Sequence, residues 1–261
     1  MVKNKVGRAV HANKGIEVSY RKSLDRMISD MAASFQFWIK VLYKKYPPKI
    51  SEIVQDSKPP SEEAEKQLAI LSSIWKNKFN EVADRLATKN IGGIFKTSQT
   101  SMQESLGSAG LSVKFKMTPS VMDALNASIS ENVGLIKSIP VQYHKQVEGI
   151  VMRAYSSGRD LETLSNELME LHPITKKRAT LIARDQCNKA NSVVNRVRML
   201  ESGIKKAIWM HSHAGKQPRK DHVASNGKVY NVSEGCYISG EYIQPGQLIN
   251  CRCTSRPVIP V

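Results

Sequence analysis

Long hydrophobic runs are missing from this sequence. None of its segments reaches the roughly 18 consecutive apolar residues that a membrane-spanning helix needs, so no membrane contact is expected. The basic N-terminal stretch has no apolar core of the kind that signal peptides carry, so no signal peptide is predicted. Apolar residues still make up 41% of the 261-residue chain, which indicates a globular protein with one large core or two small ones.

Cysteine is scarce as well. The chain has four cysteines, at positions Cys187, Cys236, Cys251 and Cys253. This number is too small for a disulfide scaffold in a chain of this length. Because no export signal is evident, we expect the thiols to be reduced.

The sequence motifs of common enzymes are absent. The chain has no P-loop, no GxGxxG, no GxSxG and no HExxH motif. Aromatic residues make up 6% of the chain and form no stacking motif. If the protein contacts nucleic acid, the composition therefore favours contact with the backbone over readout of the bases.

Acidic residues are the scarcer charged class. The 39 lysines and arginines exceed the 23 aspartates and glutamates by a net charge of +16, and the segment Ile174–Val261 alone holds 15 basic and 5 acidic residues. An excess of this size attracts polyanions, and we interpret it as contact with DNA or RNA. A basic, well-solvated surface without a nucleic-acid role is the alternative interpretation.

Helical spacing of apolar residues dominates the first three quarters of the chain. It predicts a helix from Leu24 to Leu42 that stops at the prolines of "YPPK". After a polar linker, Ser61 is the predicted N-cap of a second helix, which we expect the glycines of "NIGGIF" at 90–95 to break.

Proline and glycine mark the predicted ends of the next helices. Thr118 is the expected cap of a third helix, with Pro119 at its first position, and Pro140 is expected to end it. Two further helices follow, separated by Gly158, and the second is capped by Asp160.

A last helix is predicted from Thr175 to the C-cap glycine Gly203. It would open on "TKKR", whose three cations are unfavourable at the positive end of a helix dipole unless they meet an anion such as phosphate. A solvated charged turn is the alternative. The residues predicted to contact nucleic acid are Lys176, Lys177, Arg178, Arg184, Arg196, Arg198 and Arg252.

After Gly203 the pattern changes to short β-like segments between turns, "KKAIWMHSH", "GKVYNV", "YISGEYI" and "INCRCTS". The predicted fold class is therefore α+β, with a mainly helical N-terminal and central body followed by a small, turn-rich β module. The predicted organisation is a flexible basic segment 1–22, a helical region 23–115 and a domain 116–261, which contains helices over 118–202 and the β module over 204–261.

Cys251 and Cys253 lie two residues apart. On a strand both thiols would face one side and Arg252 the other. Two thiolates on one face are half of a tetrahedral zinc site. The predicted metal ligands are Cys251, Cys253, His222 and Cys236, with His211 or His213 as further candidates. A disulfide from Cys236 to one of the pair and ordinary buried thiols are the alternatives.

The segment "RKDHVASNGKVYN" contains a second candidate site. Asn226-Gly227 is a turn signal and fits a hairpin. His222 could activate water in a metal-dependent nuclease of the His-Asn type. Such a site needs a second histidine after Asn226, which the sequence lacks, and a turn in which His222 bonds a backbone group is the alternative.

The ordered set of C-terminal motifs resembles the phage Mu F-like head-morphogenesis proteins. The segment "LIARDQCNKANSVVNRVRMLESGIKKAIW" is similar to the family's helix and Trp-containing strand. The family's later motifs are matched by Arg219 and His222, Asn226-Gly227, Pro245-Gly246, "NCRC" at 250–253 and Pro257. The resemblance covers roughly residues 130–258, and the first 115 residues resemble no family.

The resemblance implies a minor head protein, not an enzyme, that acts in head morphogenesis and capsid assembly at the portal vertex. It implies localisation in the virion, inside the head near that vertex, and in the host cytoplasm during assembly. The implied partners are the portal or other head proteins, with the N-terminal helices as a docking surface, and packaged double-stranded DNA, bound without sequence preference during packaging or ejection. A metal-dependent nuclease is the alternative function. A particle-borne effector is a third, which residues 1–115 would have to supply, and their helical pattern shows no catalytic constellation.

Overall fold

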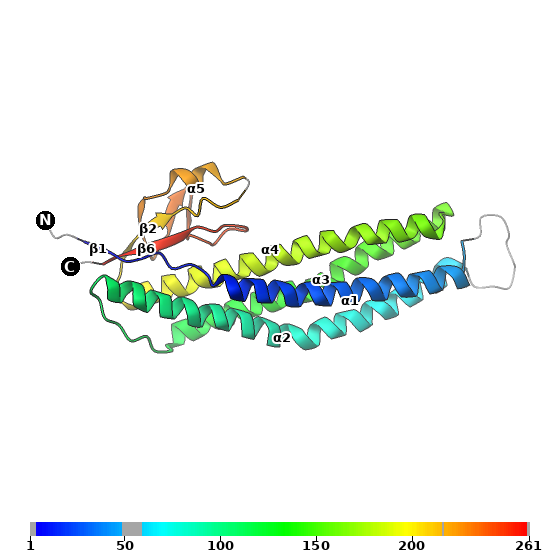
Figure 1. Cartoon of the computed structure of the whole chain (residues 1–261), viewed down its shortest axis with the longest axis horizontal. Coiled ribbons are helices and arrows are strands. Elements are labelled where there is room, and N and C mark those ends of the chain that lie inside the picture. Colours follow the sequence, from blue (N-terminus) through cyan, green and yellow to red (C-terminus); the bar gives the residue numbers. More distant parts are fainter. Residues whose placement is uncertain (1–3, 49–58, 216, 260–261) are drawn as a thin grey trace. The chain divides into compact units, whose positions relative to one another are not determined.

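The computed structural model describes residues 4–48, 59–215 and 217–259. The helices in this part are α1 (Lys14–Lys45), α2 (Pro60–Ser108), α3 (Pro119–Ser157), α4 (Leu161–Glu201) and α5 (Lys220–Ala224). The strands are β1 (Lys5–Val6), β2 (Lys206–Met210), β3 (Val229–Asn231), β4 (Cys236–Ile238), β5 (Glu241–Ile243) and β6 (Thr254–Ile259). Four long helices precede a small antiparallel strand module, which confirms the predicted α+β class (Figure 1). Most of the predicted polar linker, residues 49–58, lies outside the described residues.

Several helix ends lie where the sequence predicts them. Helix α1 ends at Lys45, ahead of the proline pair. The Thr118 hydroxyl accepts a hydrogen bond from the Val121 N–H at the start of α3 (3.3 Å), and Asp160 Oδ1 accepts one from the Thr163 N–H at the start of α4 (2.9 Å). Gly203 has a φ of 71° after α4, the left-handed conformation that a C-cap glycine supplies.

Three predicted helix breaks were wrong. Helix α2 runs through "NIGGIF", α3 continues past Pro140, and α4 passes Pro173, so Thr175 and the "TKKR" cations lie inside a helix and not at its start. Ser61 also lies inside α2, because the Glu62 N–H bonds to the Pro59 carbonyl.

Packing explains why these helices continue. The apolar stripe of α3 persists across its proline, with Ile139 and Tyr143 both buried, so the helix tolerates one missing hydrogen bond. At Gly93 a Cβ atom would lie 3.2 Å from the side chain of Ile16, so the small residue lets α1 and α2 approach closely there. Burial against neighbouring helices outweighs the local preference of glycine and proline.

The N-terminal segment, predicted to be flexible, is held in place over its described residues. Strand β1 pairs antiparallel with β6, and Lys5 lies opposite Ile259. The carbonyl of Val10 accepts hydrogen bonds from Asn191, Asn195 and Thr254, at 3.0, 3.2 and 2.7 Å. These partners come from α4 and β6, so only tertiary structure orders this segment.

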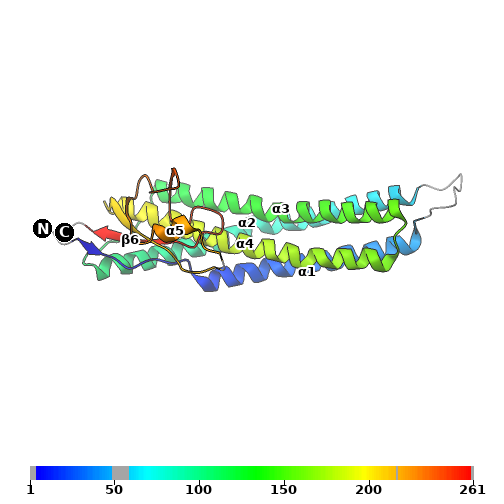
Figure 2. The same cartoon turned by 90° about the horizontal axis from the view of Figure 1, so that it is seen from above.

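The chain forms two compact units that interleave along the sequence. One consists of residues 21–85 and 133–180, in which segments of α1, α2, α3 and α4 lie side by side (Figure 2). Its core includes Phe35 and Tyr143, whose rings meet edge to face at 5.5 Å. The predicted family-domain boundary at residue 116 remains a prediction.

The other unit consists of residues 1–20, 86–132 and 181–261 and carries the β module. Its main sheet has the strand order β1-β6-β2-β3, and β4 and β5 form a separate pair. Trp209 on β2 is fully buried in a core with Met199 and Val232. Two predictions fail here. Helix α5 lies between β2 and β3, so Asn226-Gly227 does not form a tight hairpin, and Cys251 and Cys253 precede β6 instead of lying on it.

Among the described residues, no helix is both long and apolar enough to cross a membrane.

Candidate functional site: a histidine-cysteine cluster beside a basic pocket

Helix α5 holds His222 in place. The Asp221 carboxylate accepts the His222 backbone N–H at 2.9 Å through Oδ1 and the Ser239 hydroxyl at 2.9 Å through Oδ2. These hydrogen bonds, that of Ser239 above all, lower the pKa of Asp221. Ahead of α5, the Arg219 guanidinium donates to the Ile249 carbonyl at 3.0 Å and so ties α5 to the segment that carries the cysteines.

The segment before β6 is tied to α4. Asn250 has a φ of 62°, and its N–H donates to the buried carboxylate of Asp185 at 2.7 Å. Gly246 has a φ of 84°, and a Cβ there would lie 3.2 Å from both the Asn188 carbonyl and Ser192 Cβ. The Asn-Cys-Arg-Cys and Pro-Gly motifs thus share one function, which is to pack this segment against α4.

His222, Cys251 and Cys253 form a buried cluster. His222 Nδ1 lies 3.5 Å from Cys251 Sγ and 3.6 Å from Cys253 Sγ. Their ligand atoms all lie within 4.8 Å of one another, and the three residues are 2%, 3% and 6% exposed. The His222 ring stands perpendicular to the Trp209 indole, with centroids 5.2 Å apart. Three of the four predicted metal ligands therefore come together.

The two thiols of the cluster differ in acidity. The hydrogen bond between the two side chains is the main cause that lowers the pKa of Cys251 and raises the pKa of Cys253. Burial disfavours the charged form of both. The pair therefore favours a single negative charge between the two sulfurs over two.

Cys236, the fourth predicted ligand, lies outside this cluster. It is buried on β4, and burial raises the pKa of its thiol. His211 lines the pocket beside the cluster, and its Nδ1 accepts the backbone N–H of His213 at 3.1 Å. His213 itself is exposed.

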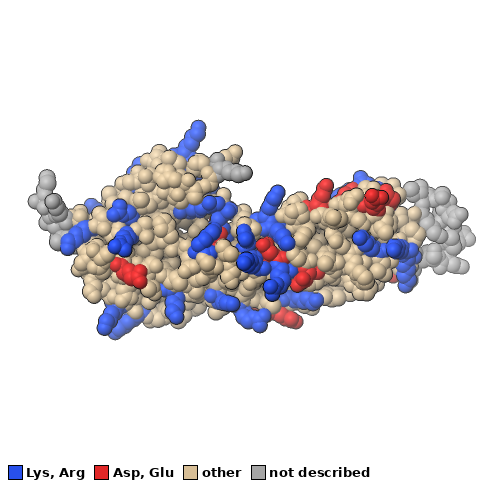
Figure 3. Space-filling view, in the orientation of Figure 1, with Lys and Arg blue, Asp and Glu red and all other residues tan. Residues whose placement is uncertain are grey.

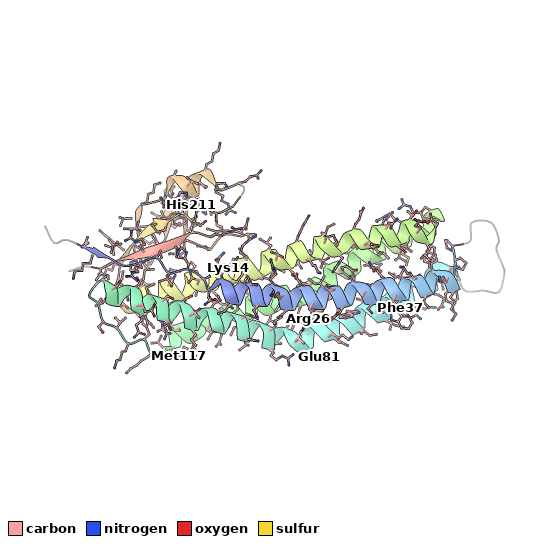
Figure 4. The ribbon with its side chains drawn as sticks, in the orientation of Figure 1. Lys14, Arg26, Phe37, Glu81, Met117 and His211 are labelled. Carbon is pink, nitrogen blue, oxygen red and sulfur yellow. The ribbon has the colours of Figure 1, made fainter. Side chains whose placement is uncertain are left out.

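A second, basic pocket lies next to the one that His211 lines. Arg252 and Cys253 line both pockets. Arg184 of α4 meets Arg252 there, and the pKa of Arg184 is lowered, mainly by burial and also by the charge of Arg252. Further lining residues include His11, Lys14, Asn188, Ser212 and one carboxylate, Glu17, which pairs with Lys14. Figure 4 labels Lys14 at the start of α1 and His211 after β2.

The two arginines are not ion-paired within the described residues, although the charges of Glu17 and Asp185 partly offset the lowering of the Arg184 pKa. Arg184 Nε is buried without a hydrogen-bond partner, and neither arginine forms an ion pair within the described residues. Two cations in one pocket repel each other unless an anion lies between them. The arrangement is therefore suited to binding a phosphate.

The other predicted nucleic-acid residues are distributed differently. Lys176, Lys177 and Arg178 lie within α4 in the other compact unit. Lys177 is exposed, Lys176 is half-buried, and the Arg178 guanidinium donates to the Ser138 hydroxyl at 2.8 Å. Lysine and arginine side chains are spread over the face drawn in Figure 3, with acidic side chains between them.

Arg196 and Arg198 donate hydrogen bonds within the protein and stabilise its fold. The Arg196 guanidinium donates to the carbonyls of Val232 and Ser233, at 3.2 and 2.5 Å. Arg198 is 1% exposed. Its guanidinium bonds to Glu201, to Gln99 and to the Lys116 carbonyl, and it covers the ring of Phe115. Its predicted contact with nucleic acid was wrong, because the guanidinium is buried out of reach of a phosphate and both of its terminal nitrogens are hydrogen-bonded within the protein.

His11 and Lys14 were missed by the sequence interpretation. They precede or begin α1, and only the pairing of β1 with β6 brings them to the pocket. A basic N-terminal segment was the one local signal, and it did not identify particular residues.

Comparisons with known proteins bear on this part of the chain. The family model described as "Phage Mu protein F like protein" matches residues 145–256, which confirms the resemblance seen in the sequence. A protein of Haemophilus influenzae (strain Rd), described as an uncharacterized protein, is 34% identical over 149 residues, which make up 57% of this chain and 32% of that protein. The chain thus spans about a third of the length of this curated relative. No solved structure matches the chain.

Proposed function

From the similarity of residues 145–256 to the phage Mu F-like family, we propose that this chain is a minor head protein of a tailed bacteriophage or prophage. It acts in head morphogenesis, lies inside the head near the portal vertex, and contacts packaged double-stranded DNA without sequence preference. Before assembly it resides in the host cytoplasm. Its role is structural, in assembly and in packaging or ejection of DNA.

One observation carries the DNA contact, namely the meeting of Arg184 and Arg252 in one pocket. Both lie within the family-matched residues, and neither forms an ion pair with a carboxylate among the described residues. The nearby carboxylates of Glu17 and Asp185 offset the positive charge of Arg184 in part. Guanidinium groups bind phosphate oxygens in pairs of hydrogen bonds. The net charge of +16 adds a general attraction, with release of counterions from the DNA.

A protein-docking surface is proposed on the unit that lacks the β module. Its exposed apolar side chains on α1 and α2 are Phe37, Trp38, Val41, Ile70 and Ile74. Phe37 is labelled on α1 in Figure 4. Trp38 and Val41 also line an apolar pocket with Leu71, and exposed apolar patches of this kind mark protein contacts. The proposed occupant is the portal or another head protein.

Association with heads tests this function. Heads purified from the phage or prophage that encodes the chain are treated with protease, opened and analysed by mass spectrometry. The proposal expects the chain to be present and protected. Its absence from intact heads would contradict the proposal.

A metal-dependent nuclease remains the second candidate, because His222 lies in a potential metal cluster. Incubation of linear duplex DNA with the protein and Mg²⁺ or Zn²⁺ separates the two functions. A head protein leaves the DNA intact and retards it in a gel. Fragments that disappear when His222 is replaced by glutamine would favour the nuclease.

A further inference from the structure

We propose that His222, Cys251 and Cys253 bind one zinc ion, through Nδ1 of the histidine and Sγ of each cysteine. None of these three ligands is among the residues proposed to contact DNA. The ion would connect helix α5 to the segment that leads into β6.

The distances fit a tetrahedral ion. Zinc lies about 2.3 Å from thiolate sulfur and about 2.0–2.1 Å from imidazole nitrogen, so two such ligands at a tetrahedral angle are about 3.6 Å apart. The observed separations from His222 Nδ1 are 3.5 Å to Cys251 Sγ and 3.6 Å to Cys253 Sγ. His222 is thus spaced as a ligand relative to each cysteine, and all three ligand atoms lie within 4.8 Å of one another.

The type of ligand selects the metal. Two thiolates and an imidazole are soft or borderline donors, which favour zinc over magnesium or calcium. All three side chains are buried, which limits the competition of water that weakens exposed sites. The Trp209 indole against the His222 ring fixes the ring's orientation, as the surroundings of metal ligands commonly do.

The pocket lined by His211 and Arg252 is also lined by the three proposed ligands, so a fourth ligand would reach the ion from this pocket. His211 Nδ1 accepts a hydrogen bond from the backbone, so a neutral ring carries its proton on Nε2. His211 is therefore placed as a donor to a fourth ligand, water or a small anion, and not as a ligand itself.

The positions of the three ligands along the chain indicate a structural role for the ion. His222 follows β2 and Trp209, whereas the cysteines come at the end of a long turn-rich segment. Over this part the described strands have three residues each, too few to fix the segment by backbone pairing alone. The ion would close this segment onto α5, as structural zinc does in small domains.

Metal content of the purified full chain tests the site. The chain is expressed with added zinc, purified under reducing conditions and passed through gel filtration. Inductively coupled plasma mass spectrometry should then find about one zinc per wild-type chain. Cys251→Ser and Cys253→Ser should each hold at least about tenfold less. Cys236→Ser is the matched control, a buried cysteine of the same module outside the cluster, and should retain the wild-type content.

Cobalt binding by the wild-type chain tests the site without relying on variants, which could lose zinc because they do not fold. Cobalt replaces zinc in such sites, and thiolate coordination gives a charge-transfer band in the near ultraviolet. The proposal expects this band from the wild-type chain at one cobalt per chain. Wild-type protein that binds neither metal would overturn it, as would equal loss of zinc from Cys236→Ser and Cys251→Ser. An intact mass showing a Cys251–Cys253 disulfide under the same reducing conditions would also overturn it.

Discussion

Arg184 and Arg252 meet in one pocket although α5 and most of the β module separate them in the chain, and the charge of Arg252 helps to lower the pKa of Arg184. The Asn250 N–H, two residues before Arg252, donates a hydrogen bond to the carboxylate of Asp185, which follows Arg184, and this bond fixes the pairing. The same bond positions Cys251. The proposed phosphate contact and the proposed zinc site therefore depend on one junction between α4 and the segment before β6.

Replacing Arg198 tests its assignment as a structural residue. Arg198→Ala leaves Glu201 and Gln99 without their buried partner, and we expect it to lower the free energy of unfolding by about 3 kcal/mol. Urea denaturation measures this loss. Lys205→Ala removes an exposed cation from the same unit and should change stability by less than about 0.5 kcal/mol. Equal effects of the two variants would contradict the assignment.

Gly246 is predicted to be required by backbone conformation and close packing. Gly246→Ala places a Cβ 3.2 Å from α4 at a φ of 84° and should lower the free energy of unfolding by about 1–3 kcal/mol. Gly134→Ala is the control, because nothing lies within 4 Å of a Cβ there. Within helix α3 this change should raise stability by about 0.5–1 kcal/mol. A neutral Gly246→Ala would show that the segment does not pack as described.

Asp160 should make stability depend on pH through the start of α4. Hydrogen bonds from the backbone and side chain of Thr163 lower the pKa of Asp160. The group therefore stabilises the fold above its unfolded pKa of about 3.9, and this contribution is lost as the pH falls through the lower folded pKa. Asp160→Ala should be less stable than wild type at pH 7 by thermal unfolding, and the difference should shrink in acid. A difference that is constant across this range would exclude the cap.

The docking surface is tested by single changes, because removing residues 1–115 would delete β1, α1 and α2 with their core residues. Trp38→Ala should reduce incorporation of the chain into heads while leaving its stability nearly unchanged, since Trp38 is about half exposed. Met169→Ala removes an exposed apolar side chain from α4 and is the control. Quantitative mass spectrometry of purified heads measures incorporation, and equal incorporation of both variants would place docking elsewhere.

The sequence predicted what local chemistry determines. Thr118, Asp160 and Gly203 mark helix ends because their side chain or φ acts within one turn. The break expected at Pro140 and the new helix start expected at Thr175 failed because burial of the neighbouring residues, which local patterns do not report, keeps both helices continuous.

The candidate site was predicted where local spacing determines it and not where the tertiary fold does. The spacing of Cys251 and Cys253 brought both thiols to one side even though they do not lie on a strand. His222 could be chosen from the motif, but Cys236 could not be rejected, because its distance from the pair depends on the β module's tertiary fold. Arg198 and Arg184 lie on the same helix, and only burial separates a structural arginine from one that faces the pocket.

The most direct test of the account is the affinity of the purified chain for linear duplex DNA as a function of salt. For a phosphate-binding protein the logarithm of the binding constant falls linearly with the logarithm of salt concentration, by about 0.9 per contact. We predict steep dependence for the wild type and a slope reduced by about two in Arg184→Ala/Arg252→Ala. Lys205→Ala/Lys228→Ala, which removes the same charge from exposed positions of the module, should change the slope less. Equal slopes for the wild type and the arginine variant, or no binding at low salt, would contradict the proposed contact with DNA.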